Sequence, residues 1–345
     1  MDNLTFTPAE RRELMSGLRR IWRAESVRPD NHTARLLLTR LTDTASAGVP
    51  RDEFGLNRAV LAVQSIALAV ESMGLRGPAL RAYLISEVCT EADAVALAAE
   101  FGSEVKAAVE ALLRVKTIEA KTEALRTDNF RNLLVSQAGD MRVVLLLIAG
   151  CVERMRRIKD SDNEVARRDV STEAAYVYAP LAHKLGLYKL KSELEDLSLK
   201  YLEHDAYYRI KENLNATKKS RDAYIERFIA PIRKMLDAEG MRYHIKGRTK
   251  SIHSIWQKMK KQGCGFEGVF DLFAIRIILD VPQQQEKAQC WKVFSVITAK
   301  YESNLHRLRD WLTVPKSNGY ESLHITVRGP EDKWVEVQIR SERMD

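Results

Sequence analysis

The sequence has few of the features that mark a secreted, zinc-binding or membrane-spanning protein. Its four cysteines, Cys89, Cys151, Cys264 and Cys290, lie far apart and form no CxxC pair. This pattern argues against a disulfide framework and a cysteine zinc site, and it is typical of reduced thiols. The longest apolar run, residues 143–152, is too short to cross a bilayer. We therefore expect a cytoplasmic protein.

Aromatic residues are also scarce. They make up 7% of the 345 residues, so the chain has few of the stacking surfaces on which single-stranded nucleic acids bind. Charged residues are plentiful, and lysine and arginine outnumber aspartate and glutamate by 55 to 47. The net charge of +8 favours a polyanionic partner, which means a nucleotide, a nucleic acid or an acidic surface.

Glycine and proline are sparse up to about residue 235, where apolar residues recur at steps of three and four. Residues 105–113 and 187–201 each form one apolar stripe of this kind, which predicts α-helices. Thr7-Pro8-Ala9-Glu10 has the pattern of a capping box at a helix start rather than that of a signal peptide. We therefore expect an all-helical N-terminal region.

The pattern changes after Gly240. Alternation predicts strands at 242–246, 323–327 and 334–340, and the nearly continuous apolar run 272–279 predicts a buried strand. Helical periodicity predicts helices at 251–261 and 286–301. The length of the chain favours two or three domains. The fold class we predict is α+β: an all-α domain followed by a mixed β-sheet flanked by helices.

Residues 246–262 form a basic segment without an acid. Its lysines and arginines are Lys246, Arg248, Lys250, Lys258, Lys260 and Lys261. Gly247 is predicted to end a strand just before a helix, and such a junction suits phosphate because the helix N-terminus offers free N–H groups. A solvated basic helix face explains the charge pattern equally well.

The last two strands are predicted to form a hairpin with one apolar and one polar face. Its polar positions are His324, Thr326, Arg328, Glu336, Gln338 and Arg340. Both an ordinary surface hairpin and the floor of a polar cleft fit this pattern. Just before the hairpin, Asn318-Gly319 predicts a tight turn that gathers Lys316, Asn318, Tyr320 and His324.

Four strings in this region resemble the synthetase domain of RelA/SpoT homologues. They are GRTKSIHSIWQKM (247–259), FDLFAIRI (270–277), PKSNGYESLH (315–324) and VEVQIR (335–340), in the family's order and at about its spacing. Residues 178–202 resemble the family's helical connector. The resemblance covers most of the chain. It implies an HD-type hydrolase domain with connector helices at 1–195 and a nucleotidyltransferase-like synthetase domain at 196–345.

The resemblance implies that the chain transfers a pyrophosphate from ATP to the ribose 3′-hydroxyl of GDP or GTP, as a pyrophosphokinase of the stringent response. Arg248 and Arg276 would sandwich the adenine of ATP, and Arg248 would count among the catalytic residues. The ATP phosphates would be held by Lys250, Ser254 and Lys258.

The resemblance also implies a magnesium ion bound by Asp271 and Glu336, with Glu336 helping to deprotonate the 3′-hydroxyl. Tyr320 would stack on the guanine. The rest of the acceptor pocket would be formed by Lys316, Asn318, His324 and Gln338. Asp271 and Arg276 are five residues apart and would face opposite ways on a regular strand. Asp271 therefore either precedes the strand or the strand is irregular.

The hydrolase half departs from the family's pattern. Bifunctional members hold a metal with a histidine, a His-Asp pair and a later aspartate. Ser86 and Glu87 stand where the pair belongs, Gly150 stands where the later aspartate belongs, and His32 lies near the first ligand position. These residues leave too few ligands for a transition metal. We expect a folded but catalytically inactive hydrolase domain that serves as a scaffold or regulator.

Two other functions fit parts of the sequence: a non-catalytic regulator that senses nucleotides, and an RNA-binding module. The two carboxylates argue against the first, and the scarcity of aromatic residues argues against the second. Residues 307–310, RLRD, carry a basic form of a family motif that leaves the choice between GDP and GTP open. Because longer family members continue beyond this region, we also expect a C-terminal regulatory region that contacts the ribosome and tRNA.

Overall fold

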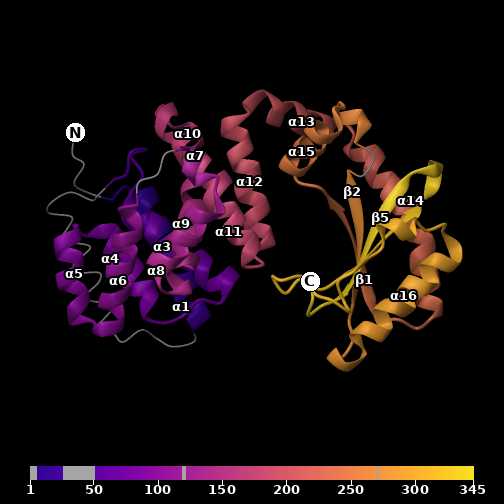
Figure 1. The fold of residues 1–345 in the computed structure, drawn as a ribbon, viewed down its shortest axis with the longest axis horizontal. Helices are drawn as coiled ribbons and strands as arrows, with labels where there is room; N and C mark the ends of the chain where they lie inside the picture. Colours follow the sequence, from indigo (N-terminus) through magenta and orange to yellow (C-terminus); the bar gives the residue numbers. More distant parts are fainter. Residues whose placement is uncertain (1–5, 26–50, 119–121, 270–271) are drawn as a thin grey trace. The chain divides into compact units, whose positions relative to one another are not determined.

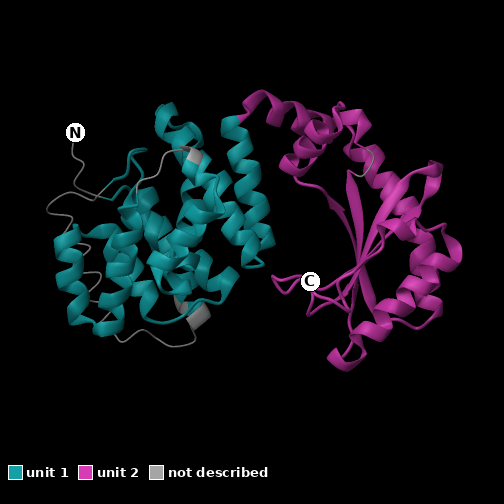
Figure 2. Ribbon diagram, viewed as in Figure 1, with its two compact units in different colours: residues 1–202 teal, residues 203–345 magenta. Residues whose placement is uncertain are grey.

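The computed structural model describes residues 6–25, 51–118, 122–269 and 272–345. It divides into two compact units, Met1–Leu202 and Glu203–Asp345 (Figures 1 and 2). The domain division predicted after residue 195 falls inside α12 (Tyr188–Leu202), a helix that packs with the first unit.

The first unit is helical throughout its described part, apart from one isolated bridge between Arg51 and Asn57. Its helical segments are α1 (Pro8–Glu25), α3 (Arg58–Met73), α4 (Pro78–Val88), α5 (Glu91–Glu100), α6 (Ser103–Lys116), α7 (Thr122–Leu125), α8 (Asp128–Ala138), α9 (Met141–Arg157), η2 (Ile158–Asp160), α10 (Glu164–Glu173), η3 (Ala174–Tyr178), α11 (Ala179–Lys184) and α12. The prediction of an all-α first domain is confirmed.

Local signals set the ends of these helices. The capping box at α1 is confirmed, because the Glu10 N–H donates to Thr7 Oγ1 at 3.2 Å and the Thr7 N–H donates to Glu10 Oε2 at 2.7 Å. Asn57 caps α3 through its side-chain oxygen, and Gly74 ends that helix at a φ of 66°. The helix between them is apolar almost all round, so it lies in the middle of the unit's core.

Within the described residues, no helix is by itself long and apolar enough to cross a membrane. One pair of segments, Asp128–Ala138 and Met141–Asp160, meets the length and composition criteria together, but across a bend of 118°.

The second unit is a five-stranded sheet with helices. Its main elements are α13 (His204–Ala216), α14 (Lys218–Ala238), β1 (Tyr243–Thr249), α15 (Ile252–Gln262), β2 (Phe273–Leu279), α16 (Glu286–Lys300), β3 (Arg309–Asp310), β4 (Leu323–Arg328) and β5 (Trp334–Ser341). Short 3₁₀ turns lie at Phe266–Gly268, Gln283–Gln285, Leu305–Arg307 and Pro330–Asp332. The strand order is β1-β2-β5-β4-β3.

Among the strands that the structure describes, the β2–β5 pair is parallel and the other pairs are antiparallel, so the sheet is mixed and the α+β prediction is confirmed. The predicted hairpin is β4–β5. Two details differ from the expectation. The first strand continues through Gly247 to Thr249, which places Arg248 on the strand because its pairing with β2 continues that far. Strand β3 has two residues, too few to show an alternation.

One face of the sheet is packed against α14 and α16 (Figure 1). The odd-numbered residues of β2, β4 and β5 lie in this core, together with Phe228 and Ile232 of α14 and Val293 and Ile297 of α16. Because side chains alternate along a strand, the even-numbered residues project from the opposite face. We call that opposite surface the polar face.

Phe228 tests this core. Its side chain is fully buried and lies 5.2 Å, between ring centroids, from Tyr301. Phe228→Ala should lower the free energy of unfolding by about 3–5 kcal/mol because it leaves a cavity. Urea unfolding followed by tryptophan fluorescence measures the change, since most tryptophans lie in the second unit. Val314→Ala, at an exposed site, should stay within about 0.5 kcal/mol. Equal effects of the two variants would contradict the packing described.

Candidate active site

The strand register arranges the predicted site residues in rows across the polar face. One row across β1, β2, β5 and β4 is Arg248, Ala274, Glu336 and Thr326. The next row, extending to β3, is Lys246, Arg276, Gln338, His324 and Arg309. Residues that are far apart in the sequence therefore become neighbours on one surface.

Glu336 lies near the centre of this surface. Its Oε1 atom accepts a hydrogen bond from Gln338 Nε2 at 2.8 Å and lies 3.2 Å from His324 Nδ1. Burial alone would raise the pKa of Glu336, but the hydrogen bonds from His324 and Gln338 outweigh it and lower the pKa to about 2. Lys250 also favours the charged form. The carboxylate is therefore ionised at neutral pH, with a quarter of its side chain exposed.

The loop before β4 forms the predicted tight turn. Gly319 has a φ of 76°, a conformation that favours glycine, and its N–H donates to the Lys316 carbonyl at 2.8 Å. The turn carries Tyr320 to His324, where the hydroxyl lies 2.8 Å from Nε2. The Lys316 ammonium lies 5.2 Å from the Tyr320 ring centroid. Asn318 caps this turn through a 3.4 Å contact with the Tyr320 N–H.

The basic junction lies where β1 leads into α15. The Lys250 N–H donates to the Leu272 carbonyl at 2.9 Å, which fixes the start of the connection. Ser251 is the N-cap residue of α15, and its hydroxyl accepts from the Ser254 N–H and lies 2.8 Å from the Ser254 hydroxyl. Ser254 and Lys258 are one turn apart on the same side of this helix. The arrangement joins a helix N-terminus to cationic side chains, as the sequence predicts.

Arg248 and Arg276 lie on adjacent strands of the polar face, offset by two positions, because Arg248 pairs with Ala274. Arg248 is exposed, whereas Arg276 is largely buried and its Nη1 lies 2.6 Å from Asp345 Oδ1. Asp271, the second predicted magnesium ligand, lies outside the described residues, as does His32. Strand β2 begins after Asp271, at Phe273.

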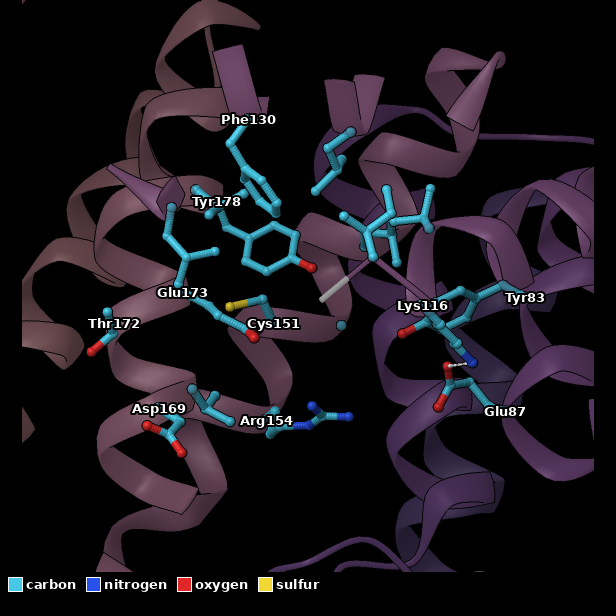
Figure 3. Close-up of a pocket in the computed structure, with 18 residues that line it drawn as sticks. Tyr83, Glu87, Lys116, Phe130, Cys151, Arg154, Asp169, Thr172, Glu173 and Tyr178 are labelled. Carbon is cyan, nitrogen blue, oxygen red and sulfur yellow. Dashed lines mark ion pairs between the residues drawn. The ribbon is translucent and has the colours of Figure 1, made fainter. Parts of the chain in front are cut away.

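The first unit contains a pocket of about 690 Å³ at the positions where the hydrolase resemblance falls (Figure 3). Glu87 of α4 and Gly150 of α9 both line it. Glu87 is paired with Lys116 of α6, whose Nζ lies 2.6 Å from Glu87 Oε1 and donates to the Ser86 carbonyl at 2.9 Å. Burial would raise the pKa of Glu87, but Lys116 outweighs it and lowers the pKa. The carboxylate is thus already neutralised by an internal cation.

The Tyr83 hydroxyl occupies the space beside Gly150. A Cβ atom on residue 150 would overlap that hydroxyl oxygen. Arg154 points into the same pocket, toward the Glu87–Lys116 pair (Figure 3). Among the described residues, no group of three or more histidine, cysteine, aspartate or glutamate side chains is placed to hold a metal ion. The described lining therefore does not fit the metal site of a hydrolase.

Two family models match the chain. One, described as "Region found in RelA / SpoT proteins", covers residues 247–345, and the other, described as "HD domain", covers residues 50–188. The GTP pyrophosphokinase of Photobacterium angustum is 36% identical over 228 residues, which are 66% of this chain and 30% of that protein. The chain belongs to the RelA/SpoT family.

Further relatives carry names for opposite reactions. The GTP pyrophosphokinase of Escherichia coli K12 is 35% identical over 238 residues, or 69% of this chain and 31% of that protein. The guanosine-3′,5′-bis(diphosphate) 3′-pyrophosphohydrolase of Aquifex aeolicus is 31% identical over 284 residues, which are 81% of this chain and 40% of that protein. The chain therefore spans 30 to 40% of the length of these three RelA/SpoT relatives.

Some residues of both sites were not assigned a role from sequence. Tyr83 lies one turn before Glu87 on α4 and Arg154 lies one turn after Gly150 on α9, so helical spacing was a signal for both. Lys116 lies on α6, and no motif joins it to Glu87. Arg340 is different. The alternation of β5 placed it on the same face as Glu336, which was a signal, but a single arginine near a predicted surface hairpin did not indicate a buried contact.

The filled space beside Gly150 can be tested by a double-mutant cycle. Gly150→Ala should destabilise the protein by about 1–3 kcal/mol, because the new methyl group overlaps the Tyr83 hydroxyl. Tyr83→Phe removes that oxygen, so the same substitution should cost less in its background. Chemical unfolding followed by circular dichroism measures both. Equal costs in the two backgrounds would show that the hydroxyl does not fill this space.

Proposed function

We propose that this chain is a (p)ppGpp synthetase, which transfers the β,γ-pyrophosphoryl group of ATP to the ribose 3′-hydroxyl of GDP or GTP. The observation that carries the proposal is the ionised Glu336, held by Gln338 and His324 on the polar face. Glu336 lies between the basic β1–α15 junction at Lys250, which suits phosphate, and the loop before β4 that carries Tyr320. The names of two relatives, GTP pyrophosphokinases, support the same reaction.

In this reaction the 3′-oxygen attacks the β-phosphorus of ATP. A new bond forms between the 3′-oxygen and that phosphorus, the bond from the β-phosphorus to the oxygen bridging it to the α-phosphorus breaks, and AMP leaves with that oxygen. The hydroxyl proton passes to Glu336. The Glu336 carboxylate is ionised, so it can accept this proton.

The remaining residues position the two nucleotides. Lys250, Ser254 and Lys258 would hold the ATP phosphates at the N-terminus of α15, where free N–H groups and cations favour anions. Arg248 and Arg276 would enclose the adenine from adjacent strands, a role that requires Arg276 to release Asp345. Holding both reactants in line supplies most of the catalysis in pyrophosphoryl transfer.

On the acceptor side, the Tyr320 ring would stack on the guanine. Lys316, Asn318, His324 and Gln338 would line the rest of the acceptor pocket. In the structure, Lys316 and His324 lie next to this ring, and Gln338 pairs with His324 across β4 and β5. Two of the proposed acceptor residues, His324 and Gln338, also contact the Glu336 carboxylate.

Magnesium is part of the proposal. Glu336 fits this ion, since its carboxylate is ionised and partly exposed and Mg²⁺ prefers one or two carboxylates together with substrate phosphates. Asp271 is the second proposed ligand. When bound, the ion would neutralise charge on the phosphates. The full protein, which we propose to be cytoplasmic, would place this catalytic half under a C-terminal region that contacts the ribosome and tRNA.

We also propose that the chain lacks the opposite, hydrolytic activity. The support is the first-unit pocket, where Lys116 neutralises Glu87 and Tyr83 fills the space next to Gly150. An ammonium group cannot be a metal ligand, and its ion pair opposes the binding of a second cation to the same carboxylate. The hydrolase domain would then act as a scaffold or regulator.

The synthetase proposal predicts that ATP, Mg²⁺ and GDP or GTP yield AMP and a 3′-pyrophosphorylated nucleotide. Glu336→Gln should lower kcat by at least about 100-fold, because it removes the negative charge and the proton acceptor. ATP affinity, measured by calorimetry, should change little. Glu331→Gln on an exposed loop is the matched control. If the parent forms no product and binds nucleotide as tightly as Glu336→Gln, the chain is a nucleotide-sensing regulator instead.

The second proposal predicts that a 3′-pyrophosphorylated guanine nucleotide releases no pyrophosphate when incubated with the chain and Mn²⁺. The reason is the absence, from the described pocket, of a ligand set that could hold the ion. Pyrophosphate is quantified by a coupled assay, and synthesis by the same preparation shows that the protein is folded. Hydrolysis that is abolished by Glu87→Gln would overturn the proposal.

A further inference from the structure

Five side chains on the polar face form a closed ring of polar contacts. Arg340 Nη2 lies 2.6 Å from the Tyr320 hydroxyl and 3.0 Å from Gln338 Oε1. Tyr320 contacts His324 Nε2 at 2.8 Å, and His324 Nδ1 contacts Glu336 Oε1 at 3.2 Å. Gln338 Nε2 closes the ring by donating to the same Glu336 oxygen at 2.8 Å. Two arms therefore connect Arg340 to Glu336.

The direction of each bond follows from the two ends. A guanidinium can only donate hydrogen bonds, and an ionised carboxylate can only accept them. Since Tyr320 accepts from Arg340, its own proton can be given to His324 Nε2, and His324 then donates from Nδ1 to Glu336. In the other arm, Gln338 accepts through its oxygen and donates through its nitrogen. Every bond runs from Arg340 to Glu336, without a conflict in either arm.

Arg340 is an unusual residue for this position. Its side chain is 3% exposed, and burying a charged group is costly unless it is paired. Its ion-pair contact is a long one, 3.5 Å from Nη1 to Asp345 Oδ1. Its shortest contacts are instead to two neutral groups, Tyr320 and Gln338. A buried cation that donates its hydrogen bonds to neutral side chains orients those side chains more than it stabilises the fold.

We propose that Arg340 is a positioning residue of the synthetase site, which sets the direction of both arms and so couples the Tyr320 acceptor platform to the Glu336 carboxylate. This inference rests on the proposed function. Both arms end on Oε1, and no hydrogen bond from a described residue reaches Oε2. The ring thereby leaves one carboxylate oxygen for the reaction while the other is held. The position of the Tyr320 ring, on which guanine would stack, and the orientation of the Glu336 carboxylate both depend on Arg340.

The first test uses the free protein and needs no activity. In the ¹⁵N-labelled chain, long-range proton–nitrogen correlation spectra report the two ring nitrogens of His324, assigned with His324→Gln. Arg340→Met and Tyr320→Phe should shift the His324 Nε2 signal in the same direction, and the double variant should add little, because Arg340 acts through the hydroxyl. Arg343→Met, whose guanidinium pairs with Glu286 and Glu321, should leave it unchanged.

The second test is kinetic. Arg340→Met should lower kcat by about 10- to 100-fold through misorientation and raise the KM for the acceptor, with the KM for ATP unchanged within about two-fold. In the Tyr320→Phe background the same change should cost much less. Guanidinium ion added to Arg340→Ala should restore part of kcat, whereas it should not affect Arg343→Ala.

Arg340→Lys keeps the charge and serves if the methionine variant does not fold. Lysine has three donors but lacks the planar fork, so it should give an intermediate shift of the His324 signal and an intermediate kcat. Signals of His324 that stay at their parent positions in both Arg340→Met and Arg340→Lys would overturn the proposal. So would additive effects of Arg340→Met and Tyr320→Phe on kcat. A parent chain without synthetase activity would refute the proposed function instead, and the spectra would still decide the role of Arg340.

Discussion

The pairing of β5 with β2 on one side and β4 on the other is the constraint on which the candidate active site depends. Strand β5 alternates between residues that enter the core under α14 and α16 and residues that project from the polar face. A shift of one residue in its register would bury Glu336 among apolar side chains and expose Val337. The apolar packing that stabilises this unit therefore also holds the Glu336 carboxylate on the polar face.

On the polar face, hydrogen bonds from neighbouring side chains stabilise charged groups that are partly or fully buried. Glu336 stays ionised because His324 and Gln338 donate to it, so hydrogen bonding outweighs the cost of desolvation. Arg340 is more deeply buried and donates to the opposite ends of the two arms. A cation and an anion are thus separated by neutral side chains that carry hydrogen bonds in one direction. Such a network favours one arrangement of its members, which suits a site whose proposed reaction depends on position.

In the first unit, a buried carboxylate is also stabilised by a neighbouring residue, in this case by a lysine. Lys116 supplies, from α6, the positive charge that Glu87 of α4 requires at its buried position. Tyr83 supplies the volume beside Gly150. These contacts stabilise the helices around the pocket without an external ion. Relatives in the family carry synthetase and hydrolase names, and the proposal that this chain lacks the hydrolytic activity rests on these contacts.

Much of the architecture could be predicted because it depends on local patterns. The alternation at 334–340 and the tight turn at Asn318-Gly319 are properties of neighbouring residues, and both appear in the structure. Strand β3 could not be predicted, because two residues show no period and its pairing depends on β4. The end of β1 was placed too early for the same reason, since its partner strand extends it through Gly247 to Thr249.

By itself, the sequence determined the helical first domain, the mixed sheet, the polar face of β5 and the family resemblance, since these follow from periodicity and short motifs. Only the tertiary structure decided which polar residues meet. The pairing of Lys116 with Glu87, the contact of Tyr83 with Gly150 and the ring that joins Arg340 to Glu336 link different helices or strands. Their distances depend on the packing of whole elements, and no local pattern records that packing.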